Sequence, residues 1–435
     1  MVPAQAAAQQ VDAILSPTEM LPLPGHLNTI PVLNSNSPEV VQQPGIIVST
    51  LSPEGKSTVG AHLNYAFKGR FDIFFHHISK VEVSPVGAAP PLLYIGVVLH
   101  NPGAAPVVVE VLQGASYVSQ PDAPFVPLQP HMDNSDGAVY SGPGDRVTND
   151  LLRGKLQNGI VKAKKFEIPA NANVLLSSLP IPVDGLSPLL NGRTYLVKLN
   201  SSGPVEGATL AAYATTSGEP SAQEWFAILQ NGPLAGPRER AVSDGSYGRV
   251  SGVAIGDEWI AAPAIMRLPS RGKSFSFPIA SVERGTFGTG QVQSAPLAQR
   301  IEGTAAAAHG NYGVKYDITL PLENTSKQSI MALVKLQTPI KSDIKSGSIQ
   351  YAKSPLPRVF FRGTVRTTFI DARGLKHQKY IHLTQRQGET AVPLVAQFLL
   401  PHEKRSVRLE FLYPPDATPP QVLTIESVDP DSLLD

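Results

Sequence analysis

Two related segments, far apart in the chain, place the strongest limit on the fold. The segments from Tyr94 to Gln113 (YIGVVLHNPGAAPVVVEVLQ) and from Tyr316 to Gln337 (YDITLPLENTSKQSIMALVKLQ) each contain two apolar runs around a turn. Over positions 316–323, apolar residues alternate with mostly polar ones, a period that places apolar side chains on one face of a β-strand. Each segment therefore predicts a β-hairpin, with turn residues at 101–106 and 324–329.

A second pair of segments makes this repetition more informative. The runs from Phe166 to Pro182 and from Phe398 to Pro414 both contain an apolar pair, a proline, four mostly polar residues and a strand-like stretch. When the prolines are aligned, Pro169 follows Asn101 by 68 residues and Pro401 follows Asn324 by 77. Such a turn commonly precedes one of the last strands of an immunoglobulin-like sandwich. The order predicts an all-β chain with two tandem immunoglobulin-like antiparallel β-sandwich domains.

The predicted domain organisation follows from these landmarks. We expect a signal-peptide remnant or flexible N-terminus over 1–20, a first sandwich with an N-terminal extension over 21–215, a linker over 216–275 and a second sandwich over 276–430. One short helix is predicted at 222–231, because Ser221 and Glu224 form a capping box and Gly232 is a stop signal. Segments 232–247 and 284–312 are interpreted as long Pro/Gly-rich loops or extended crossings, and the first sixty residues as holding at most a few edge strands.

The amino-acid composition limits the classes of protein to which this chain can belong. Charged residues make up 16% of the 435 residues, against roughly 25% in soluble globular proteins, and 41 prolines with 36 glycines favour short elements joined by turns. A formal net charge of +1 predicts no general attraction to nucleic acid. The absence of cysteine excludes disulfides, thiolate metal sites and a cysteine nucleophile, and it suits an exported protein.

The N-terminus and hydropathy bear on location. No apolar run approaches the roughly 18 residues that a membrane-spanning helix needs, so no transmembrane segment is predicted. The start, MVPAQAAAQQ, is similar to the cleavage region of a secretory signal whose basic and apolar parts are missing, or it is a flexible Ala/Gln-rich terminus. Both interpretations remain open.

Three segments carry a family resemblance: HGNYGVKYDITLPLEN (309–324), GSYGRVSGVAIGDEW (245–259) and the Pro-rich opening LPLPGHLNTIPVLNSNSPE. Together they resemble a family of exported cyanobacterial proteins classified only as a domain of unknown function. The resemblance covers nearly the whole chain after residue 20. It implies an envelope or extracellular location, and no activity or catalytic residues.

Two segments suggest metal ligands at first sight. His76 and His77 are adjacent, but neighbouring strand residues point to opposite faces, so we expect one interior imidazole and one that meets solvent. The segment from His131 (HMDNSDGAVYSGPGD) is rich in oxygen donors, but with Gly137 at the sixth position of a calcium loop, Pro143 takes the twelfth, which requires a carboxylate. An Asx-rich turn or an irregular Ca²⁺ site remain alternatives, and no metal ligand is assigned.

Catalytic motifs are incomplete. DGSYG (244–248) lacks the first glycine of a nucleophile elbow, and GTFGTG (285–290) has the wrong glycine order for dinucleotide binding. Asp257 and Glu258 beside Trp259 provide acids next to an aromatic ring, as in sugar hydrolases, but paired carboxylates must be located in space. No catalytic residue and no cofactor is predicted.

The most unusual local feature of the sequence is a concentration of positive charge. From Lys353 to Arg408 there are eleven Lys or Arg and three Asp or Glu residues, while the remainder of the chain is net negative. The predicted basic surface contains Arg362, Arg366, Arg373, Lys376, Lys379, Lys404, Arg405 and Arg408. It suits anionic envelope polysaccharide or lipid headgroups, and solvated strand faces are the plainer interpretation.

The sequence therefore favours a non-enzymatic, periplasmic or extracellular protein that acts in binding or assembly, possible partners being anionic polysaccharide or other envelope components. A carbohydrate-active enzyme or carbohydrate-binding protein of the envelope is the alternative. A deep cleft with two facing carboxylates would favour the hydrolase.

Overall fold

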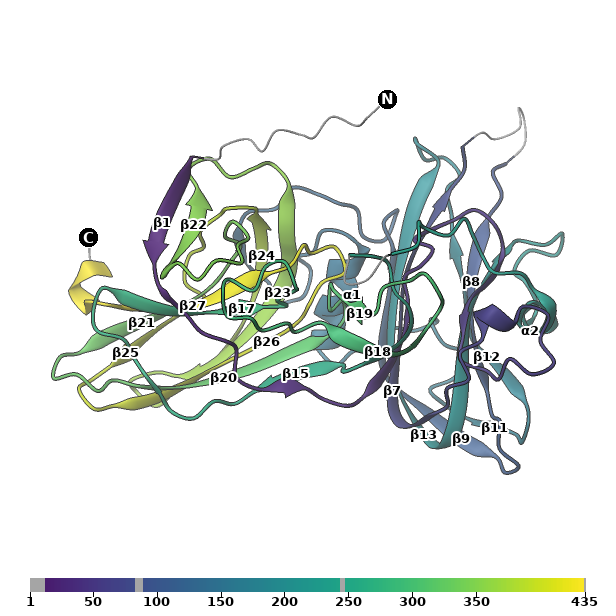
Figure 1. Cartoon of the computed structure of the whole chain (residues 1–435), viewed down its shortest axis with the longest axis horizontal. Helices are drawn as coiled ribbons and strands as arrows, with labels where there is room; N and C mark the ends of the chain where they lie inside the picture. Colours follow the sequence, from purple (N-terminus) through teal and green to yellow (C-terminus); the bar gives the residue numbers. More distant parts are fainter. Residues whose placement is uncertain (1–11, 83–88, 243–246, 434–435) are drawn as a thin grey trace.

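The computed structural model describes residues 12–82, 89–242 and 247–433, and these residues fold mainly into β-strands (Figure 1). Within them lie two α-helices, α1 (Pro143–Leu152) and α2 (Ala222–Asn231), and 3-10 turns at Val59–Ala61 and Pro430–Leu433. The prediction of an all-β chain is confirmed. Of the signal remnant or flexible N-terminus expected over 1–20, residues 1–11 lie outside the described residues, and residues 13–17 and 19–20 form strands.

Twelve strands form a hydrogen-bonded sheet that folds into two layers around one core, and we call this part the first body. Its strands are β4 (Pro31–Ser35), β5 (Val40–Val41), β6 (Gly45–Ser49), β7 (Phe67–Lys80), β8 (Leu93–His100), β9 (Val107–Val118), β11 (Lys165–Ile168), β12 (Asn173–Ile181), β13 (Leu190–Tyr213), β14 (Ser251–Ile255), β18 (Ala295–Arg300) and β19 (Ala307–Ala308). The 24-residue β13 joins the layers, because its first half pairs with β7 and β9 and its second half with β6 and β8.

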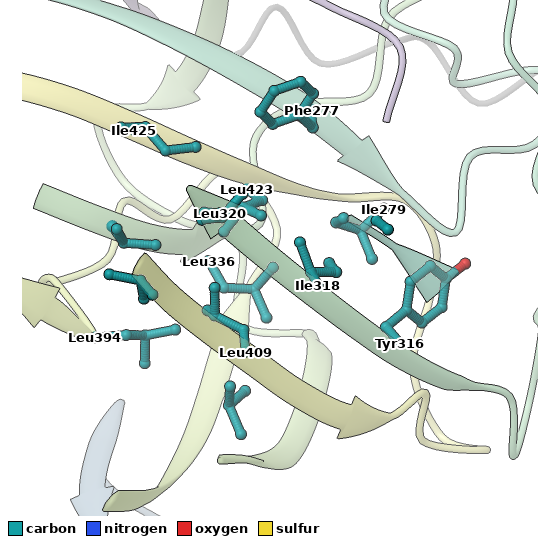
Figure 2. Close-up of a cluster of buried hydrophobic side chains, with 14 of the residues drawn as sticks. Phe277, Ile279, Tyr316, Ile318, Leu320, Leu336, Leu394, Leu409, Leu423 and Ile425 are labelled. Carbon is teal, nitrogen blue, oxygen red and sulfur yellow. The ribbon is translucent and has the colours of Figure 1, made fainter. Parts of the chain in front are cut away.

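Two further sheets enclose the core of the second body (Figure 2). The eight-stranded sheet contains β3 (His26–Leu27), β10 (His131–Asp133), β15 (Glu258–Ala261), β16 (Met266–Arg267), β20 (Lys315–Glu323), β23 (Val359–Ile370), β24 (Lys376–Arg386) and β26 (Lys404–Leu412). The five-stranded sheet contains β2 (Glu19–Met20), β17 (Lys273–Ile279), β21 (Ile330–Gln337), β25 (Val395–Leu399) and β27 (Gln421–Val428). A separate pair joins β1 (Ala13–Pro17) to β22 (Ser348–Ala352). Along β20 the buried and half-buried residues alternate as the sequence predicts.

The repeated segments have the same hydrogen-bond pattern in both bodies. β8 pairs with β12 as β20 pairs with β26, and β9 pairs with β11 and β13 as β21 pairs with β25 and β27. Asn101 and Asn324 begin the two hairpin turns, and each side-chain amide donates to three backbone carbonyls. The duplication inferred from sequence is therefore also present in the backbone.

The alignment of the second shared element differs from the sequence-based one by a residue. The Asn101 amide reaches Ile168 and Pro169, whereas the Asn324 amide reaches Leu399 and Leu400. Pro169 is thus equivalent to Leu400 and not to Pro401. The asparagine contacts define which residues are equivalent, and the proline is displaced by one position between the two bodies.

Several segments predicted to be linkers or loops contribute strands. β14, β15 and β16 lie within 216–275, and β18 and β19 lie within 284–312. β4 is an interior strand between β7 and β14, although only edge strands were expected in the first sixty residues. These strands form because distant parts of the chain supply their hydrogen-bond partners, and their short sequences contain no pattern that predicts this pairing.

The two helices have different places in the molecule. α2 has the predicted bounds and capping box, and Trp225 and Leu229 bury its inner face against the outside of the first body. α1, which was not predicted, lies between the two bodies (Figure 1). Val147, Leu151 and Leu152 pack there together with Leu196 of the first body and Leu412 of the second.

Candidate functional site

A groove between the two bodies is the strongest candidate for a binding site. It consists of a cavity of 480 Å³ between the bodies and an adjoining cavity of 650 Å³, which is lined by segments 34–37, 234–250 and 301–312; the two share Asn36, Arg249 and Tyr312. We call it the inter-body groove. The smaller cavity is also lined by Glu39 and His76 of the first body, by Phe125, and by Arg358, Arg362 and Asp416 of the second body.

An ion pair holds one wall of the groove. Glu39 lies shortly after the end of β4, and it pairs with Arg249, which lies two residues before the start of β14. Burial raises the pKa of Glu39, and the neighbouring Arg249 opposes this effect. Because β4 and β14 are hydrogen-bonded neighbours, the sheet itself brings these two residues together.

The opposite wall carries two more arginines. The Arg362 guanidinium lies 5.2 Å from the centre of the Phe125 ring, and that of Arg358 lies 5.7 Å from the Phe360 ring. Neither is among the ion pairs formed by the described residues. A guanidinium that lies against an aromatic ring keeps its in-plane N–H donors available for carboxylate, sulfate or phosphate oxygens.

Asp416 is the second acidic residue of this cavity. Burial raises its pKa to about 7, and Arg362 only partly opposes the effect. Its Oδ2 atom is buried and has no hydrogen-bond partner among the described residues. The groove therefore combines a carboxylate paired with arginine and a carboxyl group that is partly protonated near neutral pH.

Aromatic and amide groups complete the lining. The rings of Tyr247 and His309 lie 5.1 Å apart in the larger cavity, and half of the Tyr247 side chain is exposed. Such a ring offers a flat apolar face beside polar groups, which suits the mixed surface of a sugar ring. His76 lies in the smaller cavity, where its Nδ1 is 2.8 Å from the Thr194 hydroxyl and burial lowers its pKa to about 4.

The adjacent histidines point in opposite directions, as expected. His77 is fully buried, contacts Ser35 and the Pro38 carbonyl, and stacks on Phe75. His76 is half-buried and faces the groove. Among the described residues, no group of His, Cys, Asp and Glu side chains has the arrangement of a metal site.

The predicted basic surface is divided among three environments. Arg366 donates twice to Glu410, at 2.8 and 2.5 Å, and Arg408 pairs with Asp317 and Glu410. Lys404 pairs with Glu323, and Arg405 with Glu403. These four cations are largely neutralised by acids from the same sheet.

The other four predicted cations lie in two different places. Arg362 faces the inter-body groove, while Arg373, Lys376 and Lys379 are exposed on the hairpin formed by β23 and β24. Arg362 and Arg366 do lie on one face of β23, as predicted, but that face is turned toward α1 and the first body. The Asn134 amide donates to Thr364 between them.

The other motifs have structural roles. Asp257 accepts hydrogen bonds from Lys198 at 2.7 Å and from Asn28 at 2.6 Å, and Lys315 pairs with Glu258. Trp259 is buried in the core of the second body. Asp133 at the end of β10 and Asp136 in the following loop each accept the backbone N–H group two residues later, which is an Asx-rich turn.

Sequence reasoning missed Glu39, Arg249, Arg358 and Asp416. Glu39 and Arg249 lie in segments quoted above only for a family resemblance, and up to 377 positions separate the four residues along the chain. The pairing of β4 with β14 brings Glu39 to Arg249, and the packing of the two bodies brings Arg358 and Asp416 to the same cavity. No helix of the described residues is long and apolar enough to span a membrane.

Comparisons with known proteins give a family without an assigned activity. No protein with a curated description matches the chain. A crystal structure of the coconut allergen cocosin aligns over 90% of this chain and 86% of that chain, with 8% identity and a TM-score of 0.11, which does not show a shared fold. A family model described as "Protein of unknown function (DUF3370)" matches residues 18–427. The chain therefore belongs to the DUF3370 family of proteins of unknown function.

Proposed function

We propose that this protein binds an anionic polysaccharide of the cell envelope in the inter-body groove, without catalysing a reaction. The observation that supports this proposal most is the set of three arginines, Arg249, Arg358 and Arg362, around one cavity. Two of them lack a carboxylate partner among the described residues, and both lie against aromatic rings. Arginine forks recognise carboxylate and sulfate groups in pairs of hydrogen bonds.

The larger cavity gives a reason for a saccharide and not a small anion. It continues from the arginines past Arg249 and Tyr312 to the Tyr247 and His309 rings. A chain of acidic sugars would place its charged groups on the arginines and its ring faces on the aromatic side chains. We propose this site in place of the broad basic surface inferred from the sequence, because four of the eight cations of that surface are paired with acids.

A matched pair of double variants tests the proposal. We expect Arg358→Gln with Arg362→Gln to weaken binding to alginate or dextran sulfate about tenfold or more, since each charge-assisted hydrogen bond contributes about 1.5 to 3 kcal/mol. Arg373→Gln with Lys376→Gln removes the same charge from exposed positions and should change binding less than about twofold at 0.15 M salt. Affinity electrophoresis and calorimetry measure both. Equal losses of affinity in the two double variants would contradict the proposal, because they would show that binding depends only on the net charge of the protein.

A carbohydrate-active enzyme is the second candidate, and one observation favours it. Glu39 and Asp416 line the same cavity from different bodies, and the negative charge of Glu39 adds to the burial that raises the pKa of Asp416. A protonated acid opposite a carboxylate is the arrangement that glycoside hydrolysis uses. Release of reducing ends from uronic oligosaccharides that is abolished by Asp416→Asn, with binding retained, would favour this candidate over simple binding.

The proposal includes export and a cyanobacterial envelope as the setting. Its support is the low charge content and the absence of cysteine. We also propose that the two bodies derive from tandem immunoglobulin-like sandwiches with their main strands within 21–215 and 276–430. The equivalent contacts of Asn101 and Asn324 support this common plan. Detection of the protein in a periplasmic or secreted fraction tests the location.

A further inference from the structure

The hairpin between β23 and β24 ends in a tip that is both apolar and basic. Ile370 is 49% exposed and Leu375 is 57% exposed, and they stand at the two ends of the turn. Ile370 lies directly opposite Lys376 in the hairpin register. Single exposed aliphatic side chains are common on protein surfaces, but here two of them share one tight turn with exposed cations.

The charge of this tip is not neutralised by its own acid. Arg373, Lys376 and Lys379 are exposed. The carboxylate of Asp371 accepts the backbone N–H groups of Arg373 at 2.8 Å and Leu375 at 2.9 Å, and its other oxygen lies 2.8 Å from His377 Nε2. Its hydrogen-bonding capacity is thus used within the turn, so the three cations face outward.

Other contacts hold the tip in a fixed shape. Arg405 Nη1 donates to the Asp371 carbonyl at 2.7 Å, which ties the turn to the start of β26. The rings of Phe369 and His377 stack at 5.0 Å across the hairpin. A preformed turn needs little ordering when it meets a partner.

The tip lies at the end of the second body that is remote from the first. β23 runs antiparallel to β26, with Phe369 opposite Val407 and Arg366 opposite Glu410. Leu412, at the end of β26, packs into the cluster between the bodies, so the opposite end of these strands points away from it. The tip and the inter-body groove are therefore separate sites.

We propose that this tip docks the protein on an anionic lipid surface. Ile370 and Leu375 enter the boundary between headgroups and acyl chains, and Arg373, Lys376 and Lys379 contact the anionic headgroups. A polar polysaccharide would gain nothing from the two aliphatic side chains, whereas a membrane surface rewards both apolar area and positive charge. The inference does not depend on the proposed function of the groove.

Vesicle sedimentation with the full chain tests the docking. The protein should pellet with vesicles of phosphatidylglycerol and phosphatidylcholine at 0.05 M salt, and with pure phosphatidylcholine about tenfold less. The variant Ile370→Ser with Leu375→Ser keeps every charge, and Arg373→Ser with Lys376→Ser and Lys379→Ser keeps both aliphatic side chains. Each should lose about tenfold or more of the binding.

Controls separate docking from other effects. Ile14→Ser with Leu15→Ser removes two exposed aliphatic side chains from β1, 50% and 60% exposed, and should bind vesicles as the unmodified protein does. Arg358→Gln with Arg362→Gln should also leave vesicle binding unchanged, and circular dichroism verifies the fold of each variant. The proposal is wrong if the unmodified protein stays in the supernatant, or if either tip variant pellets as well as it does.

Discussion

At the scale of single residues, the two turn asparagines explain why the repetition is visible in the sequence. The Asn101 side chain donates to the carbonyls of Ala105, Ile168 and Pro169 and accepts from the Gly103 N–H. An Asn side chain alone has the amide donors, the carbonyl acceptor and the short reach to do this. Asn324 makes the corresponding contacts in the second body.

The first prediction concerns these two residues. Replacing Asn101 or Asn324 by Ala should each lower the free energy of unfolding by about 2 to 4 kcal/mol, because buried carbonyls would lose their donor. Urea denaturation measures the loss. Asn200, which is exposed on β13, provides the control, and Asn200→Ala should change stability by about 0.5 kcal/mol or less. Losses at 101 and 324 no larger than this would show that the turns do not need their asparagines.

At the scale of elements, α1 is the clearest case that sequence periodicity did not disclose. Its ten residues begin at Pro143 and include few apolar side chains, so the helical pattern is weak. It is stabilised by its surroundings: His382 Nε2 of β24 lies 2.7 Å from Asp145 Oδ2, and both side chains are fully buried. Tyr117 of the first body donates to Asp150 near the end of the helix.

The second prediction addresses this buried pair. His382→Phe would leave the buried Asp145 carboxylate with the Ser141 N–H but without its imidazole partner, so we expect the free energy of unfolding to fall by about 3 kcal/mol. His377→Phe breaks the half-exposed pair with Asp371 and should cost about 1 kcal/mol or less. Denaturation curves for the two variants give the comparison. Similar losses would mean that the contact between α1 and β24 does not hold the bodies together.

At the scale of the whole molecule, the chain crosses repeatedly between the bodies. β2 and β3 belong to the second body. The strands from β4 to β13 that follow belong to the first body, with the exception of β10. β14 also belongs to the first body, β15 to β17 belong to the second, and β18 and β19 lie in the first again. The boundary predicted at residue 276 falls inside β17 (Lys273–Ile279).

The third prediction follows from this crossing. A fragment of residues 276–430 lacks β15 and part of β17, so it should show no cooperative unfolding transition in urea. A fragment of residues 256–433 regains β15, β16 and the whole of β17. It should unfold cooperatively at a lower urea concentration than the full chain, because it still lacks β2, β3 and β10. Far-UV circular dichroism follows both. A cooperative transition in the shorter fragment would mean that the added strands are dispensable.

The sequence by itself determined the features that depend on neighbouring residues. The alternation at 316–323, the repeated hairpins and the capping box of α2 each arise within about twenty positions, so local side-chain periodicity reports them. The identity of the strands in 216–312 and the helix α1 depended on distant partners and could not be inferred in this way.

Only the tertiary structure decided where the charges act. Arg362 and Arg366 are four residues apart on one strand, yet one faces the inter-body groove and the other is paired with Glu410. Glu39 meets Arg249 because β4 pairs with β14, and Asp416 joins them because the two bodies pack together, although the three residues are remote in the chain. Electrostatic attraction depends on distance in space, and the linear order of residues does not contain that distance.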